Sequence, residues 1–211
     1  MGEGVKILAI SDVVEPMLYG TSLSSYTADA EAVVSCGDLP FEYLEYIVTI
    51  SGVPLYYVRG NHDPAEDVKS PAGCIPLDGR VVEADGLTLA GFSGSRWYSG
   101  GPNQSDERAM RNRGRLLSAK ITLDKLRGRK SPAVFVTHAP PLGLGDREDL
   151  CHTGFETFLS LIDRYHPSLW LHGHVHLYGL KTGNQRITSR GETRIVNVYG
   201  HQILEVPKPR G

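Results

Sequence analysis

The stretch Leu171-His172-Gly173-His174-Val175-His176 decides how the rest of the sequence is interpreted. It follows the apolar run 168–171, which predicts a buried strand, so the histidines lie where a strand ends. His174 and His176 are two residues apart and would point the same way on extended backbone. Gly173 lets the backbone approach another group closely. Two converging imidazoles are what a metal site needs, although a histidine cluster is also common in plain polar loops.

Polar side chains also follow four other apolar runs. The runs 5–10, 32–36, 54–58 and 133–136 lead to Asp12, Gly37-Asp38, Arg59-Gly60-Asn61-His62-Asp63-Pro64 and His138. A lone aspartate after a strand is usually a turn residue, and Asn-His-Asp-Pro is compatible with a plain β-turn. Successive strands that all end in potential ligands make the turn explanation strained.

The order of the elements predicts a layered α/β protein. Helical spacing of apolar residues marks 41–50, 104–126 and 155–165, and we expect the second helix to be interrupted near Gly114. Residues 80–84 and 87–92 predict a hairpin that turns at Asp85-Gly86. The segments 186–188, 193–198 and 202–206 predict short antiparallel strands that close a sheet. Open α/β sheets bind ligands beyond the carboxyl ends of their strands, where the polar residues gather here.

Length, composition and charge limit the class of protein. The chain has 211 residues, is 40% hydrophobic and carries a net charge of -2. These values predict one domain over residues 1–211 with a substantial core. No block of like charge, signal peptide or membrane-length apolar run stands out, so we expect no membrane partner and see no indication of nucleic acid. The cysteines are widely separated, which predicts reduced thiols in a cytoplasmic protein.

The strand ends together supply oxygen and imidazole donors without thiolate, a set that suits Mn, Fe or Zn. The donors are Asp12, Asp38, Asn61, His62, His138, His174 and His176. They are enough for two divalent ions that share one carboxylate. Two such ions clamp a phosphoryl group and generate hydroxide near neutral pH, so the implied chemistry is attack of metal-bound hydroxide on a phosphate ester.

The ordered motifs resemble those of the calcineurin-like metallophosphoesterase superfamily. They are Asp12, Gly37-Asp38, Gly60-Asn61-His62-Asp63, His138 and Gly173-His174-x-His176. The resemblance implies a four-layer α-β-β-α sandwich of the α/β (α+β) class, with mixed sheets and a metal site at the carboxyl ends of the strands. It also implies a small phosphodiester or phosphomonoester substrate. The compact bacterial branch is the most similar, which favours the diester.

The resemblance implies a role for each motif residue. Asp38 would bridge both ions; Asp12 and His176 would complete the first site, and Asn61, His138 and His174 the second. His62 would lie over the phosphate, where it stabilises developing charge or protonates the leaving group. Asp63 would orient His62, although a turn role is equally plausible. Arg96 and His152 are the candidate substrate contacts, and Arg59 is a weaker one.

One motif departs from the family pattern. The first motif of the family is D-x-H, whereas this chain has Asp12-Val13-Val14. Because valine cannot bind a metal, the first ion site could be weak. Glu15 is the nearest carboxylate, but it should point away from the position of Val14 on extended backbone. The departure keeps an alternative open: a degenerate, non-catalytic binding or scaffold protein, as in the retromer subunit built on this fold.

Overall fold

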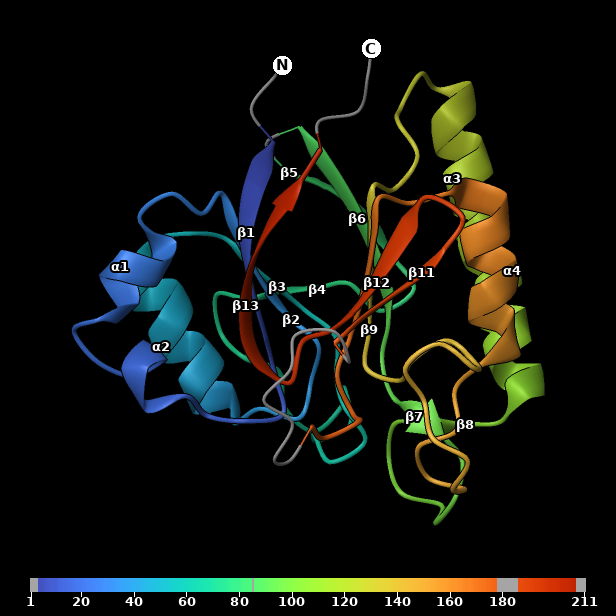
Figure 1. The fold of residues 1–211 in the computed structure, drawn as a ribbon, viewed down its shortest axis with the longest axis horizontal. Coiled ribbons are helices and arrows are strands. Elements are labelled where there is room, and N and C mark those ends of the chain that lie inside the picture. The colour runs from blue at the N-terminus through green and yellow to red at the C-terminus, as the bar shows by residue number, and fades with distance from the viewer. Residues whose placement is uncertain (1–3, 85, 178–185, 208–211) are drawn as a thin grey trace.

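Two mixed β-sheets stack face to face, and helices cover the outer side of each sheet (Figure 1). This arrangement is seen in a computed structural model that describes residues 4–84, 86–177 and 186–207. The predicted α-β-β-α sandwich is therefore confirmed. None of the described helices combines the length and the apolar character needed to cross a bilayer.

The first sheet has the order β13-β1-β2-β3-β4. Its strands are β1 (Val5–Ser11), β2 (Ala32–Ser35), β3 (Leu55–Tyr57), β4 (Ile75–Pro76) and β13 (Gly200–Val206). Strands β1 to β4 run parallel. The last strand, β13, pairs antiparallel with the first, in a register that runs from Val5 opposite Val206 to Ser11 opposite Gly200.

The second sheet has the order β11-β12-β10-β9-β6-β5. Its strands are β5 (Val81–Ala84), β6 (Leu87–Phe92), β9 (Val134–Thr137), β10 (Leu169–His172), β11 (Ile187–Arg190) and β12 (Thr193–Asn197). Strands β6, β9, β10 and β12 are parallel, and β5 and β11 are antiparallel edges. A small parallel pair, β7 (Ser95–Arg96) and β8 (Gln104–Ser105), lies apart from both sheets.

The hairpin of β5 and β6 is confirmed, although Asp85 of its turn lies outside the described residues. The expectation for the last three segments is only partly right. Strands β11 and β12 are antiparallel to each other, but β12 is parallel to β10, and β13 belongs to the other sheet. The reason is that β13 starts at Gly200 (φ 82°), where the chain crosses from one sheet to the other.

The helices divide between the two outer faces. A short 3-10 turn, η1 (Pro16–Leu18), and the helices α1 (Leu23–Thr27) and α2 (Phe41–Ser51) cover the first sheet, whereas α3 (Glu107–Leu126) and α4 (Glu156–Tyr165) cover the second (Figure 1). Gly52 ends α2 in the left-handed conformation that glycine favours at helix ends. The side chain of Asp106 caps α3 by accepting a hydrogen bond from the Ala109 N–H.

Three apolar layers fill the spaces between these four layers. Ile7 and Ala9 of β1 pack between the two sheets, while Leu8 and Ile10 pack beneath α1 and α2. This alternation follows from the two-residue period of a strand, and it explains why strands buried on both faces are almost continuously apolar. Phe135 and Trp170 stack at 4.9 Å in the third layer, under α3 and α4.

Helix α3 is continuous, so the expected interruption near Gly114 is wrong. Gly114 instead packs closely against α4. A Cβ atom on Gly114 would lie 2.9 Å from Cγ2 of Thr157, and Thr157 is held by hydrogen bonds from its amide and hydroxyl to the Glu107 carboxylate. The glycine is explained by close helix packing rather than by a break in the helix.

We predict that Gly114→Ala destabilises the protein by roughly 1 kcal/mol. The crowding against Thr157, worth about 1–3 kcal/mol, outweighs the better helix propensity of alanine, worth about 1 kcal/mol. In a Thr157→Ser background, which removes Cγ2 and keeps the hydroxyl, the same change should stabilise the protein. Urea unfolding of the four proteins of this cycle measures the difference, and equal effects of Gly114→Ala in both backgrounds would contradict the explanation.

Candidate metal centre

The loops that follow strands of both sheets meet at one edge of the sandwich. Asp38, which follows β2, lies with Oδ2 3.3 Å from Nε2 of His138, which follows β9. The main-chain N–H of His174, which follows β10, donates to both carboxylate oxygens of Asp12, which follows β1, at 3.1 Å. The predicted site residues are therefore brought together across the two sheets from segments far apart in the sequence.

Asp12 and His174 each lie at the apex of a tight turn. Their φ angles are 64° and 68°, and the residue after each bonds to the carbonyl before it: Val13 to Ser11 at 2.7 Å and Val175 to Gly173 at 2.8 Å. Three-residue turns with positive φ are rare and strained, and such strain concentrates at functional sites. Because His174 is left-handed, the expectation that extended backbone aligns it with His176 is wrong.

The orientation of His138 is fixed by a buried carbonyl. Its Nδ1 lies 2.8 Å from the oxygen of Cys36, which can only accept, so Nδ1 carries a proton. Its Nε2 then faces two acceptors, Oδ1 of Asn61 at 3.0 Å and Oδ2 of Asp38 at 3.3 Å. On its other side the Asn61 amide donates from Nδ2 to the Tyr98 hydroxyl at 3.1 Å, which leaves Oδ1 facing His138.

Three lone pairs thus converge on one point, and a proton or a cation must lie among them. Full burial alone would lower the pKa of His138, but the Asp38 carboxylate raises it to about 9, so a proton fills this role when no cation does. Nitrogen, amide oxygen and carboxylate are ligands that Mn, Fe and Zn accept. The donor chemistry therefore fits a divalent ion.

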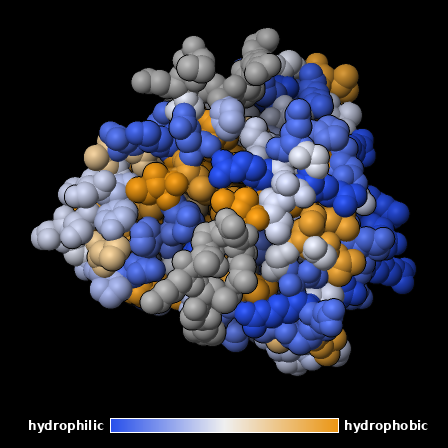
Figure 2. Space-filling view, viewed as in Figure 1, coloured by the Kyte–Doolittle hydropathy of each residue, from blue (hydrophilic) through white to orange (hydrophobic). Residues whose placement is uncertain are grey.

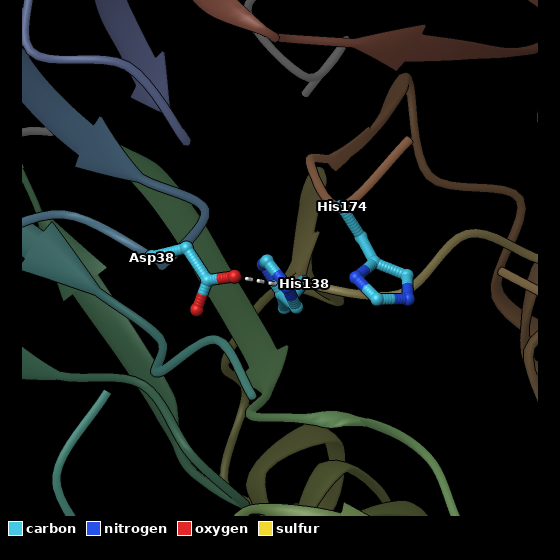
Figure 3. A group of neighbouring side chains, drawn as sticks. All are labelled: Asp38, His138 and His174. Atoms are coloured by element: carbon cyan, nitrogen blue, oxygen red, sulfur yellow. Dashed lines mark ion pairs between the residues drawn. The ribbon is translucent and has the colours of Figure 1, made fainter. Parts of the chain in front are cut away.

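His174 offers a further donor to the same point. Its Nε2 lies 2.6 Å from the carbonyl oxygen of Cys151 and must donate to it, which leaves the lone pair on Nδ1. Burial and the nearby His138 lower the pKa of His174 to about 4, so the ring is neutral. One ligand atom each from Asp38, His138 and His174 lies within 4.8 Å of the others, and Figure 3 shows a ring nitrogen of His174 on the His138 side.

Two carboxylates at the site are buried and ionised. The Asp12 side chain has 0% exposure, and the Asp38 side chain has 10%. Burial opposes ionisation of both, but His176 and His138 hold the pKa of Asp12 below its ordinary value, and His138 lowers the pKa of Asp38 to about 2. Nε2 of His176 lies 3.6 Å from Oδ1 of Asp12. Asp12, Asp38 and His176 could hold a first ion beside the one among Asp38, Asn61, His138 and His174.

The 59–64 loop is tied to Asp38 from two sides. The His62 N–H donates to Asp38 Oδ1 at 2.9 Å, while Oδ2 of Asp63 accepts from the amides of Asp38 at 2.9 Å and Gly60 at 2.7 Å. Burial raises the pKa of Asp63 to about 6. These contacts favour the turn role of Asp63 over the orientation of His62, whose own side chain is exposed at the edge of the site.

The candidate substrate contacts already have partners in the protein. Arg96 donates to the Gly154 carbonyl at 3.1 Å and lies 3.6 Å from Glu107. Arg59 is buried and bonds to main-chain and hydroxyl oxygens of residues 64–70, so it supports the loop. His152 bonds to Asp149 at 2.7 Å, and its ring lies 5.0 Å from that of His174, which leaves it beside the metal centre.

Neither residue that follows Asp12-Val13 in the first motif, Val14 or Glu15, lies where it would replace the missing histidine ligand. Val14 is 37% exposed and offers no ligand. Glu15 lies against the start of β13, with Oε1 3.5 Å from Nδ1 of His201. Sequence reasoning missed the positioning roles of Tyr98 and the Cys151 carbonyl. Tyr98 lies 37 residues from Asn61 and Cys151 lies 23 residues from His174, so no short motif connects them.

The comparison with protein families gives a match to the calcineurin-like phosphoesterase model over residues 26–178. The chain belongs to the calcineurin-like phosphoesterase family. No curated protein matches it at a significant level.

Solved structures share the fold of this family member at low sequence identity. One crystal structure is 16% identical with a TM-score of 0.65, and the alignment covers 96% of this chain and 99% of that chain. The protein TT1561 of Thermus thermophilus is 18% identical with a TM-score of 0.62, covering 96% of this chain and 94% of that chain. GAP50 of Plasmodium is 10% identical with a TM-score of 0.54, covering 94% of this chain and 72% of that chain.

We predict that Gly173→Ala weakens metal binding at this centre. An alanine Cβ would lie 2.0 Å from Ser11 Oγ and 2.5 Å from Asp12 Oδ2, so the carboxylate or the His174 turn has to move. The crowding should cost about 1–3 kcal/mol of stability. Thermal unfolding and Mn²⁺ titration calorimetry measure the two effects.

Gly20→Ala is the matched control for this substitution. The nearest atom to a Cβ on Gly20 is 3.8 Å away, which is ordinary contact. Its stability and Mn²⁺ affinity should stay at the wild-type values. Wild-type Mn²⁺ affinity in Gly173→Ala would show that the tight contact between Gly173 and Asp12 is not needed for binding.

Proposed function

We propose that this chain is a metal-dependent phosphoesterase that hydrolyses phosphodiesters in preference to phosphomonoesters. The observation that supports it best is the convergence of His138 Nε2, Asn61 Oδ1 and Asp38 Oδ2, three acceptors that require a cation or proton among them. Membership of the family supports phosphoester chemistry. The preference for diesters rests on the resemblance to the compact bacterial branch.

Two divalent ions (Mn, Fe or Zn) are the proposed cofactors, with Asp38 shared between them. The ions supply positive charge for the phosphoryl group and lower the pKa of a water molecule towards neutrality. The chain contributes the geometry: the carbonyls of Cys36 and Cys151 fix which nitrogen of each histidine offers its lone pair. Because Val14 offers no ligand, we propose that the first ion is held more weakly than the second.

His62 is the proposed catalytic residue. Its amide is fixed on Asp38 at 2.9 Å, while its side chain is exposed at the rim of the centre. From this position its ring can donate a proton to the leaving oxygen or stabilise charge that develops on the phosphate. Asp63 keeps the loop of His62 in place through the amides of Asp38 and Gly60.

The second candidate is a scaffold without catalysis. Val14 in the first motif favours it, and GAP50, which shares the fold, is described as the anchor in the inner membrane complex of Plasmodium. The buried, ionised Asp12 and Asp38 count against it, because unused desolvated charges are costly to keep. For either role we expect a cytoplasmic, single-domain protein, an expectation that the three free cysteines support.

The first prediction from this proposal is that cleavage depends on added metal. Protein stripped by a chelator should be inactive, and stepwise Mn²⁺ should restore cleavage of bis(p-nitrophenyl) phosphate more than of p-nitrophenyl phosphate. A weak first site should give a titration in two phases. Asp38→Asn, which keeps the volume of the side chain, should stay inactive at every Mn²⁺ concentration. Bound metal without cleavage of either ester would favour the scaffold.

The second prediction separates catalysis from metal binding. His62→Ala should lower kcat by about 10²- to 10⁴-fold, the usual range for loss of a general acid, while Mn²⁺ affinity and thermal stability stay the same. His166→Asn is the control, because His166 is an exposed histidine with a φ of 47° that asparagine also tolerates. Equal kcat in His62→Ala and wild type would remove His62 from the mechanism.

A further inference from the structure

Helix α3 carries an exposed apolar stripe on the side that faces away from the protein. Leu116, Ala119, Leu123 and Leu126 are spaced by three, four and three residues, the a and d positions of a heptad repeat. The three leucines have exposed fractions of 67%, 52% and 80%. We call these four residues the α3 seam.

The seam lies opposite the buried face of the same helix. Met110, Gly114, Leu117, Ser118 and Ile121 pack against the second sheet and α4. Because a helix turns by about 100° per residue, this set and the seam lie on opposite sides of α3. Helix α3 thus has two apolar faces, and the fold buries only one of them. The seam is therefore left largely exposed within the described protein, with Leu123 the most covered of its leucines.

The seam is flanked by positive charge. Arg108, Arg115, Lys120 and Arg127 occupy heptad e and g positions, and all are exposed. Residues 107–130 contain nine of the 22 lysines and arginines of the chain and only two of its 24 acidic residues. The net charge of -2 for the whole chain does not reveal this local excess of basic residues along α3 and the residues that follow it. In Figure 2, the edge of the molecule formed by α3 and α4 is largely hydrophilic, with hydrophobic patches between.

A groove between α3 and α4 continues the seam sideways. It has a volume of about 780 Å³, and its walls include Ala119 and Leu123 of the seam. The charged residues along it are three arginines and, at the first residue of each helix, two glutamates: Arg111, Arg115, Arg164, Glu107 and Glu156. A helix laid along the seam would place its side chains in this groove, with basic residues of α3 and α4 on either side. The apolar residues Ala119, Leu123 and Leu161 line the groove, as helix-in-groove recognition needs.

Charge decides between the possible occupants. A second copy of α3 would bring basic e and g residues opposite basic e and g residues in either orientation, so the two helices would repel each other. Nucleic acid would contact the arginines through its phosphates, but it would not account for exposed leucines at a and d positions. We infer that the α3 seam and the adjoining groove bind an amphipathic helix of a partner protein, with apolar a and d residues and acidic flanks.

The test uses the full chain and a synthetic probe. The probe is a peptide of about four heptads with leucine at a and d and glutamate at e and g, and its twin has lysine at e and g. The acidic peptide should bind, more weakly at high salt, and the lysine peptide should bind about tenfold more weakly or not at all. Fluorescence anisotropy of the labelled peptides measures both affinities.

Two substitutions and one control test whether the peptide binds at the seam. Leu123→Glu should weaken binding of the acidic peptide by about tenfold or more, and Arg115→Glu should weaken it while improving binding of the lysine peptide. Leu150→Glu is the control, because Leu150 is 66% exposed but lies outside the seam. Circular dichroism melting verifies that each variant is folded.

Several results would overturn the inference. They are no binding of the acidic peptide, equal binding by wild type and Leu123→Glu, or a wild-type dimer in sedimentation that Leu123→Glu dissociates. Duplex DNA binding that Arg115→Glu abolishes and Leu123→Glu leaves intact would assign the surface to nucleic acid instead.

Discussion

The hydrogen bonds from the His174 N–H to the Asp12 carboxylate join the two sheets at the edge where the candidate metal centre lies. Asp12 follows β1 of the first sheet, and His174 follows β10, a central strand of the second. Both residues stand at the apex of strained turns with positive φ, and such turns persist only where the surroundings fix them. Gly173 makes the close approach possible, because a side chain there would displace Asp12.

The electrostatics of the centre follow from this junction. Closing the sheets against each other buries two ionised carboxylates and turns the lone pairs of His138, Asn61 and Asp38 towards one point. Without a cation, the site compensates by protonating His138, whose pKa rises to about 9. A divalent ion at this point would take the place of that proton, which would couple metal binding to proton release at His138. The donors are thus arranged before any ion arrives.

The sequence was a good guide to the strands and to the place of the site. Apolar runs ending in Asp12, Asp38, Asn61 and His138 predict buried parallel strands whose ends share an edge, and the structure places them there. The sequence was a poor guide to how the site side chains are oriented and which ring nitrogen of each histidine is protonated. The proton on His138 Nδ1 is fixed by the Cys36 carbonyl, 102 residues away, and no local pattern encodes that contact.

Helix α3 shows a second limit of sequence reasoning. Leu116 and Leu117 are adjacent and chemically identical, yet one is 67% exposed and the other is 1% exposed. A helical pattern identifies apolar residues but does not say which face meets the core when two faces are apolar. Gly114 was misleading for a related reason: its role depends on Thr157, in another helix, and not on its neighbours in sequence.

The pairing of β13 with β1 bears on how the protein is made. Ribosomes release residues 5–11 long before residues 200–206, so β1 has one edge unpaired until the segment that forms β13 has been synthesised. An apolar strand with a free edge is a site for wrong pairing between chains, and closing a contact across the whole chain is slow. Completion of the first sheet therefore waits for β13, and the open edge of β1 is exposed to wrong pairing during that interval.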